Sequence, residues 1–279
     1  MMDFIKPDVR LKDYVDACYY SEGDSFPTES YSNVPTLIRS WLIFHIDGGV
    51  KVLIDEDEFV IPKTCIKASF DKPFLFKFLE PKVSAVIVQF SVSGLYELTG
   101  IDLSTIKNTY HNAYSLWGQK LLDSVNTRLS ETKDKDQRIS IVTQFVLGLI
   151  EKRQAKKVAY KVEVVKNALD IAQEKNFNLS LVEVCNELAI SPKTLERTFK
   201  TVIGITPKQY FSGRLFEYLM HEIRHNRDKQ FSDILNSPFY DYSHINKWFS
   251  RYSNIPPSMF NQMEYRVLET VLKHQTNLS

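Results

Sequence analysis

The sequence predicts an α+β protein of two domains, a β-rich N-terminal barrel or sandwich with trailing helices and an all-helical C-terminal domain. Three observations predict this division. Short runs of β-branched and aromatic residues dominate residues 1–110. A helix–turn–helix pattern recurs at an offset of fifty residues between Ser191 and Phe260. The two halves also differ in charge, because residues 1–150 hold 16 Lys and Arg against 20 Asp and Glu, whereas residues 151–279 hold 19 against 14.

The N-terminal part is expected to contain many short antiparallel strands followed by two helices. Turn-forming groups such as Asp47-Gly48-Gly49 separate the apolar runs, as in a small barrel or sandwich. The clearest strand candidates are residues 41–46, 50–54, 74–79 and 85–92, and the helix candidates are residues 116–130 and 137–153. The second helix has a broad apolar face, which either packs on its own barrel or forms a homodimer interface. The polar run at residues 151–157 is the predicted boundary between domains at 1–153 and 158–270.

The C-terminal repeat has the start and stop signals of helices. Ser191 followed by Pro192 is an N-cap with proline at the first helical position, and Thr206 followed by Pro207 repeats that signal. Gly204 stands where a helix needs a left-handed terminal residue, and Asn254 occupies that position in the second copy. Between the copies, apolar residues at helical spacing predict one helix from Pro207 to Asn226, about 20 residues and roughly 30 Å long.

The predicted second helix of the first copy has an outward basic face. Leu195, Phe199 and Val202 share one stripe, so Lys193, Arg197 and Lys200 point away from it. A solvent-facing basic helix in a helix–turn–helix is the geometry that enters the DNA major groove. The long helix would hold two such units near the ~34 Å repeat of one DNA turn. The alternative is an ordinary solvated helix face, which the duplication at fixed spacing disfavours.

These residues resemble the C-terminal domain of AraC-family transcription regulators, which has two helix-turn-helix motifs joined by a long helix. The matching segments are LAISPKTLERTFKTVIGITPKQYF, Arg214 on the linker helix, and FYDYSHINKWFSRYSNIPPSMF. The resemblance covers roughly residues 162–265. One departure is Pro238, which stands in the family's glycine place before the second recognition helix and cannot supply a left-handed turn.

The resemblance assigns candidate DNA-facing residues on both recognition helices. They are Lys193, Thr194, Glu196, Arg197 and Lys200 in the first, and Tyr242, Ser243, His244, Asn246 and Lys247 in the second. By their chemistry, Arg197 suits guanine and Asn246 suits adenine, whereas the lysines suit phosphates. Glu196 repels phosphate and accepts only from cytosine, so it is either a base reader or a discriminator.

The N-terminal half resembles, more weakly, the cupin-like domain of one group of AraC-type regulators. The segments that suggest it are LKDYVDACYY, AVIVQFSVSGLYELTGI and SLWGQKLLDSV. The resemblance implies a sensor or oligomerisation module. A metal site is not predicted, because His45 and His111 are isolated and are better interpreted as structural residues. The strand aromatics either line a ligand cavity or form plain core; they are Trp41, Phe44, Phe74, Phe76 and Phe78.

Other classes of protein fit the sequence poorly. No nucleotide-binding glycine motif or nucleophile elbow is present, so we expect neither an enzyme nor a cofactor. Three distant cysteines support neither disulfides nor a zinc site. No start resembling a signal peptide and no apolar run long enough to span a membrane is visible, so we expect a cytoplasmic protein.

The sequence therefore predicts a regulator that binds double-stranded DNA. RNA polymerase is a partner implied by the family resemblance, and a small-molecule effector and a homodimer are further expectations. The alternative is a small-molecule-binding or enzymatic cupin-like protein whose helical domain binds a protein partner.

Overall fold

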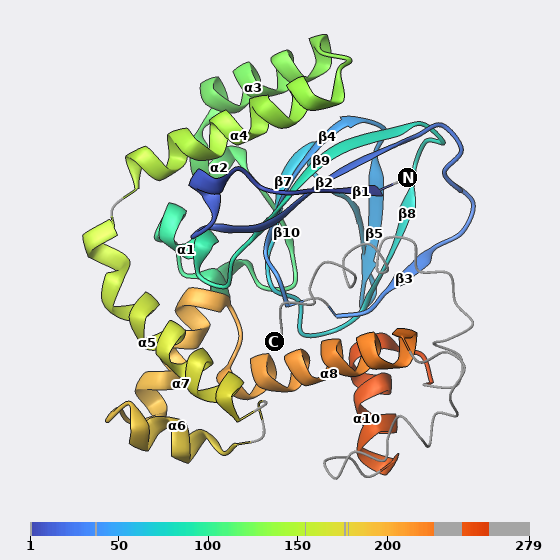
Figure 1. The fold of residues 1–279 in the computed structure, drawn as a ribbon. Coiled ribbons are helices and arrows are strands. Elements are labelled where there is room, and N and C mark those ends of the chain that lie inside the picture. The colour runs from blue at the N-terminus through green and yellow to red at the C-terminus, as the bar shows by residue number, and fades with distance from the viewer. Residues whose placement is uncertain are drawn as a thin grey trace.

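The N-terminal half of the computed structural model consists of two antiparallel β-sheets (Figure 1). The structure describes residues 2–36, 38–153, 155–175, 177, 179–225 and 242–256. The six-stranded sheet contains, in spatial order, β1 (Met2–Ile5), β2 (Val15–Gly23), β9 (Val83–Phe90), β4 (Trp41–Asp47), β7 (Thr64–Lys67) and β10 (Tyr110–Asn112). The four-stranded sheet contains β3 (Ser32–Val34), β8 (Phe74–Phe78), β5 (Val50–Ile54) and β6 (Asp57–Val60).

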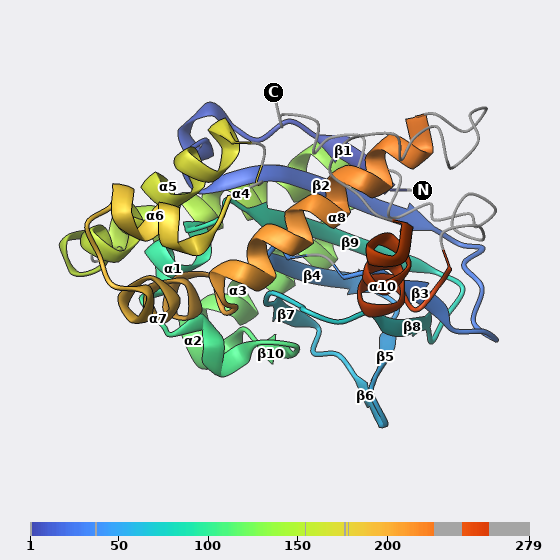
Figure 2. The ribbon, with the colours of Figure 1, turned by 90° about the horizontal axis from the view of Figure 1, so that it is seen from below.

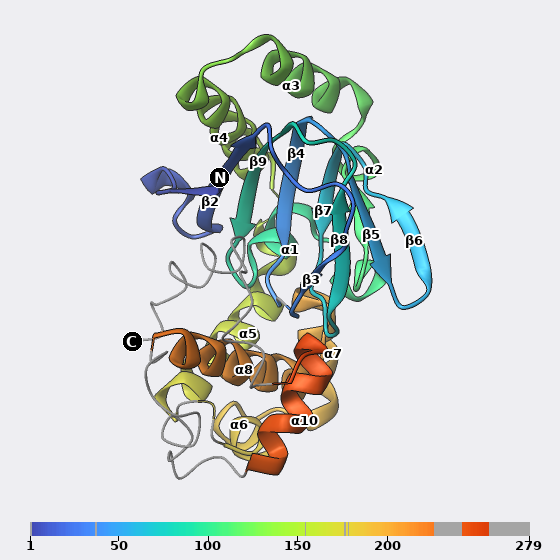
Figure 3. The ribbon, with the colours of Figure 1, turned by 90° about the vertical axis from the view of Figure 1, so that its right-hand side faces the viewer.

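The two sheets pack as a sandwich and are not joined into one closed barrel (Figure 3). Strand β4 explains how the six-stranded sheet is covered, because its residues alternate between two apolar clusters. Trp41 and Ile43 face the four-stranded sheet, whereas Leu42 and Phe44 face helices on the other side. A strand covered on both faces needs apolar residues at nearly every position, which accounts for the continuous run WLIFHI.

Helices cover the outer face of the six-stranded sheet. They are α1 (Gly94–Thr99), α2 (Tyr114–Trp117), α3 (Gln119–Glu131) and α4 (Lys135–Lys152), with short 3-10 turns η1 (Val9–Leu11) and η2 (Leu103–Ile106). The apolar face of α4 packs on the sheet: Phe145 is buried and meets the Phe44 ring edge-on at a centroid distance of 5.6 Å. Of the two predicted uses of this face, the structure therefore shows packing on the protein's own sheet.

One predicted helix is wrong in its extent. The expected helix at residues 116–130 is divided at Gly118 into α2 and α3. Gly118 has φ +80° and ψ 156°, a conformation outside the helical region that a residue with a Cβ rarely adopts. Helical periodicity on both sides of the glycine hid this break from the sequence pattern.

The C-terminal half contains α5 (Ala155–Glu174), α6 (Leu181–Glu187), α7 (Pro192–Ile203), α8 (Pro207–His225) and α10 (Tyr242–Ser253). The predicted caps are present. The Ser191 hydroxyl accepts from the Thr194 amide at 3.1 Å, and Gly204 ends α7 at φ +96°. Asn254 has φ +55°, as expected for the counterpart of that glycine. Pro238 lies outside the described residues. Of the helices within the described ranges, none has the length and apolar character needed to cross a membrane.

Candidate DNA-binding interface

Helix α7 presents its predicted basic face to solvent. Lys193, Arg197 and Lys200 are exposed, and Glu196 is exposed beside them. The opposite face carries Leu195, Phe199 and Val202, all buried in the core shared with α5 and α6. The amphipathic spacing of the sequence therefore orients this helix, because burying the apolar stripe leaves the charged residues on the solvent side.

The charges on α7 are not equivalent. Lys200 Nζ lies 2.7 Å from Glu196 Oε1, an (i, i+4) ion pair in which both side chains are about half exposed. Within the described part of the chain, Lys193 and Arg197 have no hydrogen-bond or ion-pair partner. Arg197 is therefore free to form a bidentate contact with a base. Lys200 can contact DNA only if its ion pair with Glu196 breaks or if Glu196 approaches the DNA with it.

Thr194 is half-buried and takes part in the cap of α7. Its hydroxyl lies 2.9 Å from the Ser191 hydroxyl, and its amide donates to that same oxygen. The first turn of the helix is thus fixed by local hydrogen bonds, which positions Lys193 at the helix N-terminus.

Helix α10 repeats the arrangement of α7 fifty residues later. Lys247 is exposed, like its counterpart Arg197, and Phe249 is fully buried, like Phe199. The side chains of Tyr242, Ser243, His244 and Asn246 lie outside the described residues, although the backbone of α10 includes these positions. Arg251, which the sequence analysis did not single out, is exposed next to Lys247's face and stacks at 5.4 Å on the Tyr252 ring.

Helix α8 separates the two candidate recognition helices. It has 19 residues, which gives a length of about 28 Å at 1.5 Å per residue. Helix α7 lies at one end and α10 at the other (Figures 1 and 2). Phe216 on α8 packs against Phe249 on α10 at a centroid distance of 5.1 Å. This aromatic contact holds α10 against α8.

The N-terminal half holds the C-terminal helices through hydrogen bonds near both ends of α8. At one end, the Ser69 hydroxyl donates to the Ile203 carbonyl at 2.7 Å, and Gln209 donates to Asp71 at 2.6 Å. At the other end, the Thr36 amide donates to the Tyr252 carbonyl at 2.6 Å. Each bond joins the N-terminal half to a residue at or beside one recognition helix. The N-terminal half therefore fixes how the two helices lie relative to each other.

A buried group of charged residues lies between α8 and the six-stranded sheet, and sequence reasoning missed it. Arg214 and Glu217 on α8 form a buried ion pair of 2.6 Å. Lys67 on β7 is 0% exposed, and burial lowers its pKa to about 7 although Glu217 opposes the shift. Arg39 pairs with Asp16 at 3.1 Å on the same side of the sheet. A lysine at the end of a short strand is expected to face solvent, whereas Lys67 lies against the Trp41 and Phe70 rings and donates to the Arg39 carbonyl, with Glu217 of α8 nearby. These partners lie far apart in the sequence, which is why the sequence analysis did not find the cluster.

The two histidines of the N-terminal half lie apart and have different surroundings. His45 is 8% exposed, and among the described residues neither of its ring nitrogens has a hydrogen-bond partner. Burial lowers its pKa to about 4. His111 is hydrogen-bonded through Nε2 to the Ser115 hydroxyl at 2.7 Å. In the described ranges, no three His, Cys, Asp or Glu side chains come together as a metal site would require.

The strand aromatics take part in core packing. Trp41 and Phe74 are buried between the sheets, and Phe44 is buried beneath α4. Phe76 and Phe78 are half-buried and contact each other edge-on at 5.3 Å. The sequence left two interpretations open for these five aromatic residues, a ligand cavity or the core. All five lie in or against the hydrophobic core clusters.

The described part of the chain contains one helix–turn–helix, formed by α6 and α7, and α10 repeats its basic helix fifty residues later. A helix–turn–helix with an exposed basic second helix is typical of DNA-binding proteins. Residues 184–263 match the model of a family described as helix-turn-helix domain, and this part of the chain is an AraC-type helix-turn-helix domain. The chain therefore carries the DNA-binding domain of a transcription regulator.

Several solved structures are similar to the chain at low identity. ToxT from Vibrio cholerae O395 is 13% identical over 91% of this chain and 99% of that one, with a TM-score of 0.48. Unsaturated fatty acid bound wild-type ToxT from Vibrio cholerae strain SCE256 is 13% identical over 93% and 97%, with a TM-score of 0.49. The AraC-like transcriptional activator CuxR is 13% identical over 77% and 85%, with a TM-score of 0.32. No curated protein matches the sequence.

Proposed function

We propose that this protein regulates transcription by reading two adjacent major-groove segments of double-stranded DNA, one with α7 and one with α10. The observation that carries the proposal is the pair of 12-residue helices at a fifty-residue offset, Pro192–Ile203 and Tyr242–Ser253, joined by α8. The length of α8, about 28 Å, is close to the ~34 Å between successive major grooves on one side of B-DNA.

The proposed roles follow from the chemistry of each side chain. Arg197 forks onto the O6 and N7 atoms of guanine, and Asn246 pairs with adenine. The three lysines Lys193, Lys200 and Lys247 neutralise phosphates. Glu196 restrains Lys200 through their ion pair, which supports a role in discriminating between sites. Tyr242, Ser243, His244 and Thr194 complete the proposed contacts by their positions on the two helices.

We also propose a division of labour along the chain. Residues 1–153 form a sensor or dimerisation domain, and residues 158–270 form the DNA-binding domain. The hydrogen bonds of Ser69 and Thr36 to the C-terminal helices support this coupling. The proposed partners are a small-molecule effector, a second copy of the chain and RNA polymerase. Regulation of this kind needs no catalytic step. The protein acts where the genomic DNA is, in the cytoplasm.

The direct test is to incubate the purified protein with fragmented genomic DNA from its source. The DNA retained at ~150 mM salt is then sequenced. The expected result is an enriched motif of two half-sites one helical turn apart. Affinity for that motif should fall by orders of magnitude between 50 and 200 mM salt if about 6 to 10 phosphates are contacted.

A negative result has a definite meaning. No enrichment, with or without cell extract to supply an effector, would contradict the proposal and leave the helical half as a protein-binding module. A thermal-shift screen of metabolites separately tests for an effector, because a ligand that binds only the folded protein raises its melting temperature.

A further inference from the structure

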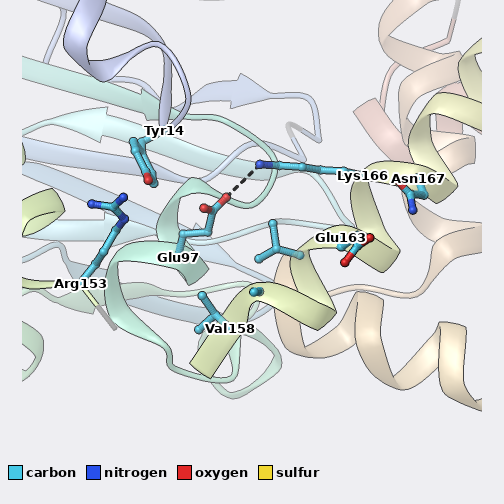
Figure 4. Close-up of a pocket in the computed structure, with 9 residues that line it drawn as sticks. Tyr14, Glu97, Arg153, Val158, Glu163, Lys166 and Asn167 are labelled. Carbon is cyan, nitrogen blue, oxygen red and sulfur yellow. Dashed lines mark ion pairs between the residues drawn. The ribbon is translucent and has the colours of Figure 1, made fainter. Parts of the chain in front are cut away.

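A hollow of about 380 Å³ lies where the N-terminal half meets α5, away from the candidate DNA interface (Figure 4). Its walls come from three parts of the chain: Tyr14 just before β2, Glu97 on helix α1, and Arg153 after α4 together with one face of α5 between residues 158 and 167. Tyr14, Glu97 and Arg153 belong to the first half of the chain, and Glu163 and Lys166 belong to α5. The volume falls at the lower end of the range typical of small-molecule sites, about 300–1,000 Å³.

The charged side chains of this hollow are arranged with opposite signs at opposite ends. Arg153 and Tyr14 lie on one side, and Glu163 and Asn167 lie on the other (Figure 4). Between them, Glu97 and Lys166 form an ion pair of 3.3 Å, and the Ser93 hydroxyl donates to the same Glu97 oxygen at 2.6 Å. The Glu97–Lys166 pair is therefore already satisfied within the protein.

The two end groups are available to a ligand. Arg153 donates to the Ile150 carbonyl and stacks at 5.1 Å on the Tyr14 ring, and among the described residues it has no carboxylate partner. Across the described residues, Glu163 and Asn167 likewise have no hydrogen-bond or ion-pair partner. Tyr14 is buried, and its pKa is raised mainly by burial, so its hydroxyl remains a neutral donor. The hollow thus offers one guanidinium with a phenol at one end and one carboxylate with an amide at the other.

The sum of these charges disfavours a simple anion. Two cations, Arg153 and Lys166, and two carboxylates, Glu97 and Glu163, line the hollow, so the net charge is zero. A phosphate or dicarboxylate would gain Arg153 but would also lie near the Glu163 carboxylate, which has no cation partner among the described residues. A ligand with one negative and one positive end would satisfy both free groups and leave the central ion pair intact.

The separation of the end groups sets the length of the ligand. Glu163 stands eight residues beyond the start of α5 at Ala155, which is about 12 Å along the helix axis. A ligand that contacts both Arg153 and Glu163 therefore has to span a gap of the order of this backbone separation. An extended peptide of two or three residues spans about 7 to 10 Å between its termini. Val158 and Val162 on α5 supply an apolar wall for its side chains.

We propose that this hollow binds a short peptide of two or three residues with free termini, its carboxylate at Arg153 and Tyr14 and its ammonium group at Glu163 and Asn167. The site joins α1 to α5, and α5 packs through Val165 and Ala168 into the core that supports α7. An occupied site would therefore clamp the first half of the chain to the helix that backs the first recognition helix.

The test is isothermal titration calorimetry of the full chain with trialanine and with two capped versions of the same peptide. N-acetyl-trialanine lacks the positive end, and trialanine amide lacks the negative end. We expect the free tripeptide to bind, and each cap to weaken binding at least tenfold. Glu163→Gln should weaken the binding of the free tripeptide by a similar factor. It should leave the affinity for the N-acetyl peptide unchanged, because the substitution and the acetyl group remove the same ionic contact.

The matched control is Glu174→Gln, an exposed carboxylate on the same helix and outside the hollow. It should bind the free tripeptide as the wild type does. Both replaced carboxylates are exposed, so the two variants should fold normally, which circular dichroism checks. Arg153→Gln should in turn reduce the advantage of the free tripeptide over its amide.

Three results would overturn the assignment. No binding of trialanine or dialanine at several millimolar would show that the hollow is not a peptide site. Binding that neither acetylation nor Glu163→Gln weakens would place the peptide elsewhere on the protein. Acetate or phosphate binding as tightly as the tripeptide would make the hollow an anion site. DNA takes no part in these measurements, so their outcome is independent of the proposed function.

Discussion

Acid should destabilise this fold through His45, and the structure gives the size of the effect. Burial lowers the pKa of His45 from 6.5 to about 4. Each pKa unit corresponds to 1.36 kcal/mol, so the shift amounts to about 3 kcal/mol. The unfolded chain binds this proton below pH 6.5, whereas the folded chain resists it down to about pH 4. The free energy of unfolding therefore falls as the pH falls from about 6.5 through 4.

The perturbation that isolates this effect is His45→Leu. Leucine is of comparable size, cannot be protonated, and removes two ring nitrogens that have no partner among the described residues. At pH 8 the variant should be at least as stable as the wild type. Between pH 8 and pH 4 the wild type should lose about 3 kcal/mol more than the variant.

Urea unfolding followed by tryptophan fluorescence at a series of pH values measures both curves. Ile43→Val, two residues away on the same strand and also buried, is the matched control. It should cost about 1 kcal/mol at every pH, because no titrating group is changed. If His45→Leu and the wild type lose stability in parallel from pH 8 to 4, the reasoning about the buried imidazole is refuted.

Three further predictions concern the DNA interface and the buried charges. Arg197→Ala should change the free energy of unfolding by no more than about 0.5 kcal/mol, because the side chain is exposed. In a mobility-shift series it should weaken binding to the true DNA site by about 1 to 3 kcal/mol and relax the preference at one base pair. Unchanged base preference would mean that α7 is misassigned. Lys247→Ala should weaken all DNA sequences alike and reduce the slope of log affinity against log salt by about one; an unaltered slope would exclude phosphate contact there. Because the pKa of Lys67 is lowered by burial to about 7, the wild type should gain stability as the pH rises from about 7 towards 10.5, and Lys67→Met should abolish that gain in denaturant unfolding. A rise that persists in the variant would assign it to another group.

The parts of the fold that could be predicted from the sequence are those fixed by local interactions. Caps and apolar spacing act within one or two helical turns, so the sequence located α7 and α10 and the left-handed residues after them. Asn254 is the clearest case, because only a residue tolerant of positive φ suits the place that Gly204 holds in the first copy. Gly204 has a second constraint that the sequence hides: a Cβ there would lie 3.0 Å from the Leu103 carbonyl oxygen.

The parts that could not be predicted depend on contacts between distant segments. Strand β9 pairs with both β2 and β4, which lie far earlier in the chain, and no local pattern specifies that order. The burial of Lys67 was equally hidden, since it depends on residues distant in the sequence, such as Arg39 and Trp41, that close around the end of β7. Arg214 could be placed on the long helix from the sequence, but its pairing with Glu217 in the interior depends on the docking of α8.

The docking of α8 also determines how a signal could reach the DNA interface. Helix α8 lies between the two candidate recognition helices. The N-terminal half forms hydrogen bonds with residues near both ends of α8. Moving the sheets relative to α8 has to break the Ser69–Ile203 bond at one end or the Thr36–Tyr252 bond at the other. If that movement lets water reach Lys67, which lies near Glu217 of α8, it also removes the burial that lowers the pKa of Lys67. Release of the N-terminal half is therefore coupled to proton uptake by Lys67 above about pH 7, so a regulator that opens in this way should open less readily as the pH rises.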